Sequence, residues 1–311
     1  MNLFQPHEWL ITETDFNAER HQIAESIFSL GNGHMGQRAN FEEQYSGKSL
    51  QGNYIGGVFF PDKTRVGWWK NGYPDYFAKV LNAPAWIGVR VLVNNQEFDL
   101  AQCEILSFYR ELDMQQGILS RAVQVKMPDG VQIAFTTERF ISVVDTEIGA
   151  LRCRLQANKN CTVRIESTIN SDVHNEDSNY NESFWDSIAQ HIDGKFVYAI
   201  DKTKKTPYDV PQFALATAIC TTFTLFRHSA LDAESSQKRN EIAVQARNDG
   251  DVIRAVRTRE EKQLAETIEI ELQANQTLQI DKLACQISTL NYAETELAEM
   301  VENRLSEAVQ K

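Results

Sequence analysis

The sequence predicts a mainly β protein, built as a large antiparallel β super-sandwich of two sheets and followed by a C-terminal linker helix. Most of the chain alternates apolar and polar residues with a period of two, as strands do when one face of a sheet is buried. Turn-forming residues separate these runs every ten or so positions, which favours a sandwich or a barrel. The number of predicted strands fits two packed sheets better than one.

The predicted strands follow one another through recognisable turns. In residues 86–94 the valines fall on one face, and Asn94 with Asn95 then forms a hairpin turn. Pro128-Asp129-Gly130 separates two further alternating runs. The other predicted strands are 119–127, 131–143, 149–157, 161–169, 195–201, 266–274 and 277–288.

A glycine-rich turn lies near the N-terminus. Residues 31–36 read GNGHMG and match the dinucleotide fingerprint G-x-G-x-x-G. That fingerprint needs a strand before it, an apolar helix after it and an acidic residue about 20 positions further on. The residues after it are a poor helix and position 56 is glycine, so the context is missing. Because Ile27, Phe28 and Leu30 before it are strand-like, we expect a strand–turn–strand corner.

The charge balance and the cysteines exclude several classes of protein. The chain has 43 acidic and 31 basic residues and a formal net charge of -12, which argues against nucleic acids and anionic membranes as partners. Its five cysteines are scattered without a C-x-x-C motif, as expected of reduced thiols in a cytoplasmic protein. We expect no signal peptide, because residues 1–16 lack a basic stretch followed by an apolar one. No apolar run reaches the roughly 18 residues of a membrane span.

An aromatic segment, residues 61–84, is the first candidate site. It combines Trp68, Trp69, Tyr73, Tyr76 and nearby basic residues such as Lys70 with loop-forming glycines and prolines. Aromatic faces beside polar groups suit sugar stacking, and loops on rigid scaffolds often carry function. The alternative is that these rings fill a core or an interface.

A polar segment, residues 172–185, is the second candidate. Asp177, Asn179 and Asn181 imitate the start of a calcium loop, but glutamate replaces its glycine and isoleucine its last glutamate, so an EF-hand is excluded. His174 with Glu176 could form an acid–base pair of the kind that sugar mutarotation needs. The alternative is a hydrogen-bonded turn.

Glu42 and Glu43 are adjacent carboxylates. On a strand they would point to opposite faces and could not flank one bond. The sequence therefore supplies no convincing catalytic pair.

Two segments depart from the strand pattern. Residues 227–251 are polar and nearly free of aromatic residues, and we interpret them as a solvated insertion. Residues 292–311 predict a helix, since Leu297, Met300, Val301, Leu305 and Val309 recur at three- and four-residue steps. We therefore expect a sandwich domain over 1–290 and the start of a helical linker over 291–311.

Four stretches together resemble family 65 of the glycoside hydrolases, most closely its maltose-cleaving members. They are ESIFSLGNGHMGQRANFEEQYSGKSLQG, GGVFFPDKTRVGWWKNGYPDYFAKVLNAPAW, LDMQQGILSR and INSDVHNEDSNYNESFWD, which occur in this order. The resemblance extends from about Glu8 to Asp186 and more loosely into the terminal helix. The insertion at 227–251 is its main departure from the family pattern.

The resemblance implies a galactose-mutarotase-like N-terminal sandwich, a helical linker, an (α/α)6 barrel and a small C-terminal β domain. Family members are typically homodimeric, cytoplasmic and free of cofactors. They cleave an α-glucosidic bond with inorganic phosphate and invert the anomeric carbon, using a glutamate of the barrel as general acid. No position of this chain matches the motifs of that glutamate or of the phosphate site, so the resemblance implies no catalytic residue here.

The resulting hypothesis is that the chain is the N-terminal, non-catalytic portion of a maltose-phosphorylase-like enzyme. Residues Trp68, Trp69, Lys70, Tyr73 and Tyr76 are then expected at the entrance to the barrel or at a dimer contact. Two alternatives stay open. One is a stand-alone carbohydrate-binding module, and the other is a mutarotase-like sugar epimerase that uses His174 and Glu176.

Overall fold

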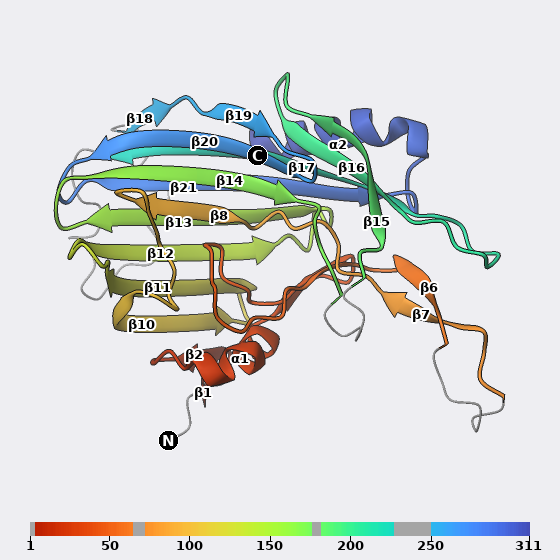
Figure 1. Cartoon of the computed structure of the whole chain (residues 1–311), viewed down its shortest axis with the longest axis horizontal. Coiled ribbons are helices and arrows are strands. Elements are labelled where there is room, and N and C mark those ends of the chain that lie inside the picture. Colours follow the sequence, from red (N-terminus) through yellow and green to blue (C-terminus); the bar gives the residue numbers. More distant parts are fainter. Residues whose placement is uncertain (1–3, 65–71, 176–181, 227–249) are drawn as a thin grey trace.

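The chain folds into two facing antiparallel sheets, with smaller elements at one end (Figure 1). The computed structural model describes residues 4–64, 72–175, 182–226 and 250–311. Within these residues the large sheet has eleven strands, in the order β1 (Phe4–Pro6), β2 (Leu10–Glu13), β10 (Glu104–Asp113), β11 (Ile118–Lys126), β12 (Gln132–Ile141), β13 (Ile148–Ala157), β21 (Thr277–Ser288), β17 (Ala214–Phe226), β16 (Val197–Thr203) and β15 (Trp185–His191), with β18 (Gly250–Ile253) paired to β17. The second sheet has five strands, in the order β19 (Val256–Arg259), β20 (Gln263–Leu272), β14 (Cys161–Asn170), β8 (Val89–Val93) and β9 (Gln96–Glu97).

The main core lies between these two sheets, which confirms the predicted sandwich. Val91 and Val163 of the five-stranded sheet are fully buried in the same apolar cluster as Phe135 and Leu155 of the large sheet. Strands β11 and β12 alternate as expected, since burial of one face keeps every second side chain out of water. Strand β21 has the bounds that the sequence predicted, 277–288.

The predicted turns are also present. Asn94 and Asn95 both adopt positive φ, 49° and 62°, as a two-residue hairpin between β8 and β9 requires. The glycine-rich stretch forms the expected strand–turn–strand corner, in which β3 (Leu30–Gly31) pairs with β4 (Met35–Gln37). Gly33 has φ 88° in that turn, a conformation that glycine adopts without strain.

The segment before this corner differs from the prediction. Ile27 is the last residue of a helix, α1 (His21–Ile27), which follows a 3-10 turn at Ala18–Arg20, and Phe28 caps it. The buried residues His21, Ala24 and Phe28 recur at helical steps, a pattern that the apolar pair Ile27–Phe28 obscured. Helix α1 packs over β10 and β11, because Ala24 and Phe28 share a cluster with Leu112 and Leu119.

Two small sheets extend from the sandwich. Strands β3 and β4 continue into β5 (Asn53–Ile55), and β6 (Phe59–Lys63) pairs with β7 (Tyr76–Val80) in a hairpin that projects away from the main body (Figure 1). The sequence predicted a polar insertion at 227–251, of which residues 227–249 lie outside the described residues. The last two residues, Gly250 and Asp251, belong to strand β18 and are not part of a solvated insertion.

The predicted C-terminal helix covers the outer face of the large sheet. A 3-10 turn at Glu294–Glu296 leads into α2 (Leu297–Gln310), where Leu297, Val301 and Leu305 are fully buried against β17 and β21. Val309, predicted on the same face, is 42% exposed because the helix extends beyond the apolar cluster there. The helix therefore covers a second apolar core on the outer face of the large sheet, and it is part of this domain as well as the predicted start of a linker.

Replacing Leu305 by alanine is expected to lower the free energy of unfolding by at least about 2 kcal/mol, since it leaves a cavity between α2 and the sheet. Denaturant unfolding would measure the loss. Val309→Ala, one helical turn further on, is the matched control and should change stability by no more than about 0.5 kcal/mol. Equal effects of the two variants would contradict the packing of α2 against the sheet.

Candidate functional site

A polar pocket opens between the segment 37–53 and the five-stranded sheet. Its volume is about 200 Å³. One wall comes from the β4–β5 strand pair and the residues between these strands, and the other from residues 82–90, Thr168, Asn170 and Gln263. Eight of its seventeen lining residues carry a side-chain amide, so the pocket offers many paired donors and acceptors but few free charges.

Three buried arginines stand behind this pocket on neighbouring strands of the large sheet. Arg110, Arg121 and Arg139 lie on the inner faces of β10, β11 and β12, and each is at most 4% exposed. Arg110 and Arg121 are direct register partners, a pairing of like charges that would destabilise the sheet by itself. Nearby carboxylates offset this repulsion between the two arginines. One of them is Glu13, whose Oε2 accepts a 2.9 Å hydrogen bond from Arg110 Nε.

Glu42 and Glu43 converge on Arg121, so the prediction that they point to opposite faces is wrong. They lie in a bend and not in a strand, and the two-residue alternation does not apply. Arg121 Nη1 donates to Glu43 Oε1 at 2.7 Å, and its Nη2 donates to Glu42 Oε2 at 2.9 Å and to the second Glu43 oxygen. Glu42 Oε1 lies 3.4 Å from Arg139 Nη1. All four carboxylate oxygens therefore face a guanidinium.

The two carboxyl groups differ in pKa because of how they share these arginines. Burial raises the pKa of Glu42, but Arg139 and Arg121 outweigh it and the pKa lies below the ordinary value. For Glu43 burial prevails over Arg121, and the pKa lies above the ordinary value.

An inverting acid–base pair must flank a sugar bond from opposite sides. Two carboxylates on one nitrogen atom leave no room for a sugar between them, so their role here is structural.

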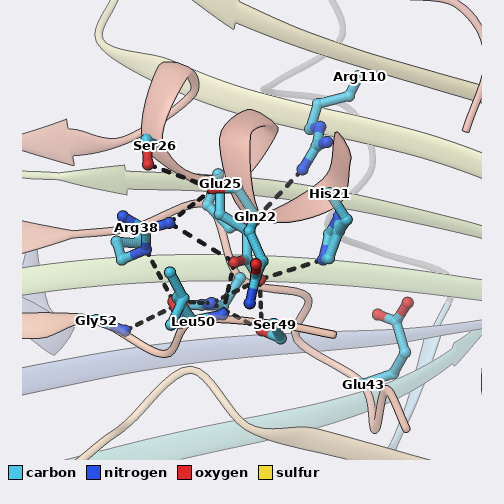
Figure 2. Close-up of polar contacts among 12 residues, drawn as sticks. His21, Gln22, Glu25, Ser26, Arg38, Glu43, Ser49, Leu50, Gly52 and Arg110 are labelled. Atoms are coloured by element: carbon cyan, nitrogen blue, oxygen red, sulfur yellow. Dashed lines mark hydrogen bonds and ion pairs between the residues drawn. The ribbon is translucent and has the colours of Figure 1, made fainter. Parts of the chain in front are cut away.

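Glu25 ties helix α1 to the wall of the pocket (Figure 2). Its carboxylate accepts hydrogen bonds from Asn40 Nδ2 and from the Leu50 backbone N–H, both at 2.8 Å, and a third from Ser49 Oγ. Burial opposes ionisation of Glu25, but the donors around it outweigh burial and lower the pKa. Arg38 Nε donates to Leu50 O at 2.8 Å. The irregular segment 38–52 is thus held in one conformation.

The aromatic residues singled out in the sequence lie elsewhere. Tyr73 and Tyr76 belong to the β6–β7 hairpin, and neither lines the pocket. The Tyr73 ring lies 6.1 Å from that of Phe77, and both side chains are nearly half exposed, while Tyr76 packs on Tyr208 at 4.5 Å. Trp68, Trp69 and Lys70 lie outside the described residues.

The second sequence candidate is tested only in part. His174 Nε2 lies 3.5 Å from Asp172 Oδ1, whereas Glu176, with the calcium-like residues at 177, 179 and 181, falls outside the described residues. In the described ranges, no three histidine, cysteine, aspartate or glutamate side chains gather closely enough to hold a metal ion. Among the same ranges, every helix is also too short or too polar to span a membrane.

Sequence reasoning missed the buried arginines, although a signal was present. Arg121 is in phase with Val123 and Val125, and Arg139 is in phase with Ile133 and Phe135. An arginine on the apolar face of a strand is seldom buried without a partner. The alternation alone could therefore have predicted that carboxylates elsewhere in the chain meet these strands.

Together, the fold and the site define a β-super-sandwich domain whose buried carboxylates are used for structure. The chain belongs to glycosyl hydrolase family 65, of which it is the N-terminal domain: the sequence profile "Glycosyl hydrolase family 65, N-terminal domain" matches residues 11–311.

Known relatives agree with this membership. The chain is 39% identical over 246 residues to the maltose phosphorylase of Bacillus subtilis strain 168, a match that covers 79% of this chain and 32% of that protein. It is 33% identical to the α,α-trehalose phosphorylase of Thermoanaerobacter brockii, over 63% of this chain and 25% of that protein. It thus spans about a third of the length of the first of these relatives.

A solved structure supports the fold. The structure named "Putative kojibiose phosphorylase from human microbiome" superposes with a TM-score of 0.79 at 19% identity. The match covers 99% of this chain and 36% of the other. The mainly β fold of this chain is therefore one that a solved structure also adopts.

Proposed function

We propose that this chain is the N-terminal, non-catalytic portion of an inverting α-glucoside phosphorylase. The intact enzyme would convert maltose and inorganic phosphate into glucose and β-glucose 1-phosphate, as a cytoplasmic homodimer without a cofactor. The observation that carries the proposal is the 39% identity to a maltose phosphorylase, a match that covers only 32% of that protein. The arrangement of Glu42 and Glu43 on one arginine supports it, because the described residues offer no opposed carboxylates at the pocket.

The 311-residue chain is expected to be inactive by itself. Purified protein, incubated with maltose and phosphate, should release no glucose 1-phosphate, while the Bacillus subtilis maltose phosphorylase in the same assay gives the positive control. The physical reason is that general acid and entering phosphate must meet at one anomeric carbon, and no position of the sequence matches the family motifs for either. Phosphate-dependent release above the blank would overturn the proposal.

One end of the sandwich has the character of a packing surface. Val143 and Val144, in the loop between β12 and β13, are 77% and 86% exposed. Asn32 Nδ2 holds this loop by donating to Ser142 O at 2.6 Å, and Lys311 at the end of α2 contacts Asp145 at 2.6 Å. Exposed apolar loops beside the helix suit contact with the catalytic part that the relatives' greater length provides.

The β6–β7 hairpin is proposed to shape the entrance to the active site or a dimer contact, through Trp68, Trp69, Lys70, Tyr73 and Tyr76. The projecting position of the hairpin and the exposure of Tyr73 support this role (Figure 1). In a chimera that joins this chain to the remainder of the Bacillus subtilis enzyme, Trp68→Ala with Trp69→Ala is expected to raise KM about tenfold or to abolish the dimer.

Steady-state kinetics and light scattering measure the two effects. Trp9→Ala is the matched control, because Trp9 is half exposed and directly precedes β2, a strand that lies away from the β6–β7 hairpin (Figure 1). An unchanged KM and an unchanged mass of the double variant would refute the proposed role.

A further inference from the structure

Lys282 is buried between the two sheets without an acidic partner among the described residues. It lies midway along β21 and is 1% exposed. Its Nζ donates to Gly88 O and to Thr168 O, both at 2.9 Å. The register partners of Lys282 on β13 and β17 are Leu151 and Thr221, and neither carries a charge. Lysine is almost never fully buried unless an opposite charge pairs with it, so this position is exceptional.

The hydrogen bonds at Nζ fit an uncharged amine better than an ammonium group. An amine has two N–H donors, and the two carbonyl oxygens accept both of them. An ammonium group has a third donor, for which the described residues provide no further acceptor. Lys282 is in phase with Ile280 and Ala284, which are fully buried in the main core, so its surroundings are apolar. Burying an unpaired charge there costs far more than burying an amine.

Among the described residues, two titratable groups on other strands face Lys282, and neither compensates a positive charge. Glu266 on β20 is bound elsewhere: its Oε1 lies 3.0 Å from Arg257 Nε, and its Oε2 accepts a 3.0 Å hydrogen bond from the Thr221 backbone N–H. Cys153 on β13 is fully buried, and burial keeps the pKa of its thiol well above the ordinary value. Burial lowers the pKa of Lys282 to about 7, although Glu266 opposes the shift.

The hydrogen bonds of Lys282 connect the two sheets beside the polar pocket. Strand β21 belongs to the large sheet, whereas Thr168 lies on β14 and Gly88 directly precedes β8, both strands of the five-stranded sheet (Figure 1). Gly88 and Thr168 also line the pocket. The Thr168 backbone N–H donates to Gly88 O at 2.9 Å, so Lys282 is bound where these two segments meet. A charged Lys282 could reach water only if the sheets separated locally at this point.

We propose that Lys282 is a pH-sensitive tether between the two sheets. Its uncharged amine joins them above neutral pH, and protonation below neutral pH loosens the contact at Gly88 and Thr168. The inference is independent of the proposed function, because it concerns the packing of the two sheets and no step of phosphorolysis.

The direction of the pH effect follows from linkage. Folded Lys282 loses its proton at lower pH than the unfolded chain does, for which the ordinary pKa is 10.5. The stability contributed by the amine is therefore fully present above about pH 10.5 and is lost as pH falls through about 7.

Titration of the 311-residue chain, followed by NMR, tests the charge of Lys282. In protein labelled with carbon-13 at the ε carbon of lysine, one resonance should titrate with a midpoint near pH 7, and it should be missing from the spectrum of Lys282→Met. A midpoint near the ordinary value of 10.5 for the resonance that this variant lacks would overturn the proposal.

Hydrogen exchange of the backbone amides in β8 and β14 tests the loosening. The parent is compared at pH 6 and pH 8 with Lys282→Met, which keeps an apolar side chain of similar length. The ratio of parent to variant opening should be about tenfold higher at pH 6 than at pH 8, since a folded pKa of about 7 gives that change by linkage. Lys126→Met, the same change of side chain at an exposed position of β11, is the matched control. A ratio of parent to Lys282→Met that is equal at both pH values would overturn the proposal.

Discussion

Replacing Arg121 by methionine is expected to lower the free energy of unfolding by about 3–5 kcal/mol. The guanidinium is 4% exposed and contacts both Glu42 and Glu43. Methionine fills much of the same volume but leaves Glu43 buried without a cation and Glu42 with Arg139 alone. Breaking a buried ionic network in this way costs far more than an exposed pair contributes. Denaturant unfolding at neutral pH measures the loss.

Arg90→Met provides a closely matched control. Arg90 also pairs with two glutamates, Glu97 at 2.8 Å and Glu166 at 3.3 Å, but its side chain is 46% exposed. Water screens these pairs, so the substitution should cost less than about 1 kcal/mol. If the two arginine variants lost equal stability, burial would not be what makes the Arg121 network important.

The sequence predicted the regular parts of the fold well because alternation reports burial directly. Strand β21 and the Asn94–Asn95 turn follow from period and turn chemistry alone. Helix α1 was missed because its seven residues are too few for a clear helical period beside the apolar pair Ile27–Phe28. Short elements of this kind are decided by tertiary packing more than by local preference.

The pocket could not be predicted from the sequence. Its walls come from segments around positions 40, 85, 168 and 263, which only the pairing of distant strands brings together. The residues 38–52 follow no period, because hydrogen bonds to Glu25 and not a sheet ladder fix their path. For the same reason, the rule that adjacent residues of a strand point to opposite faces does not apply to Glu42 and Glu43. The aromatic hairpin stays a prediction, since Trp68 and Trp69 lie outside the described residues.

The second large effect concerns Asp201, a buried acid on β16. It is 1% exposed, its Oδ2 accepts a 2.7 Å hydrogen bond from Ser171 Oγ, and its Oδ1 has no partner among the described residues. Burial raises the pKa of Asp201 to about 7, with Ser171 and Lys262 opposing the shift. The folded protein therefore keeps a proton that the unfolded chain, with the ordinary value of 3.8, releases at lower pH.

This difference makes stability fall as pH rises through the window between about 4 and 7. The contribution of the protonated carboxyl is fully present below the unfolded pKa and is lost as pH approaches the folded pKa. Three pH units at about 1.36 kcal/mol each set an upper limit of roughly 4 kcal/mol. Asp201→Asn carries an uncharged group of the same shape, so the variant should match the parent near pH 4 and exceed its stability progressively up to about pH 7.

The test is to measure unfolding curves of parent and variant at intervals between pH 4 and pH 8. The difference between their free energies of unfolding reports Asp201 alone, because the two proteins share all other titrating groups. Asp186→Asn on the neighbouring strand β15 is the control, as it makes the same change of side chain at an exposed position. Above pH 7 the advantage of the Asp201→Asn variant should level off, since both folded and unfolded parent are then ionised. A difference that does not change between pH 4 and pH 8 would show that Asp201 is ionised in the folded protein throughout, and that its burial is offset by partners beyond Ser171 and Lys262.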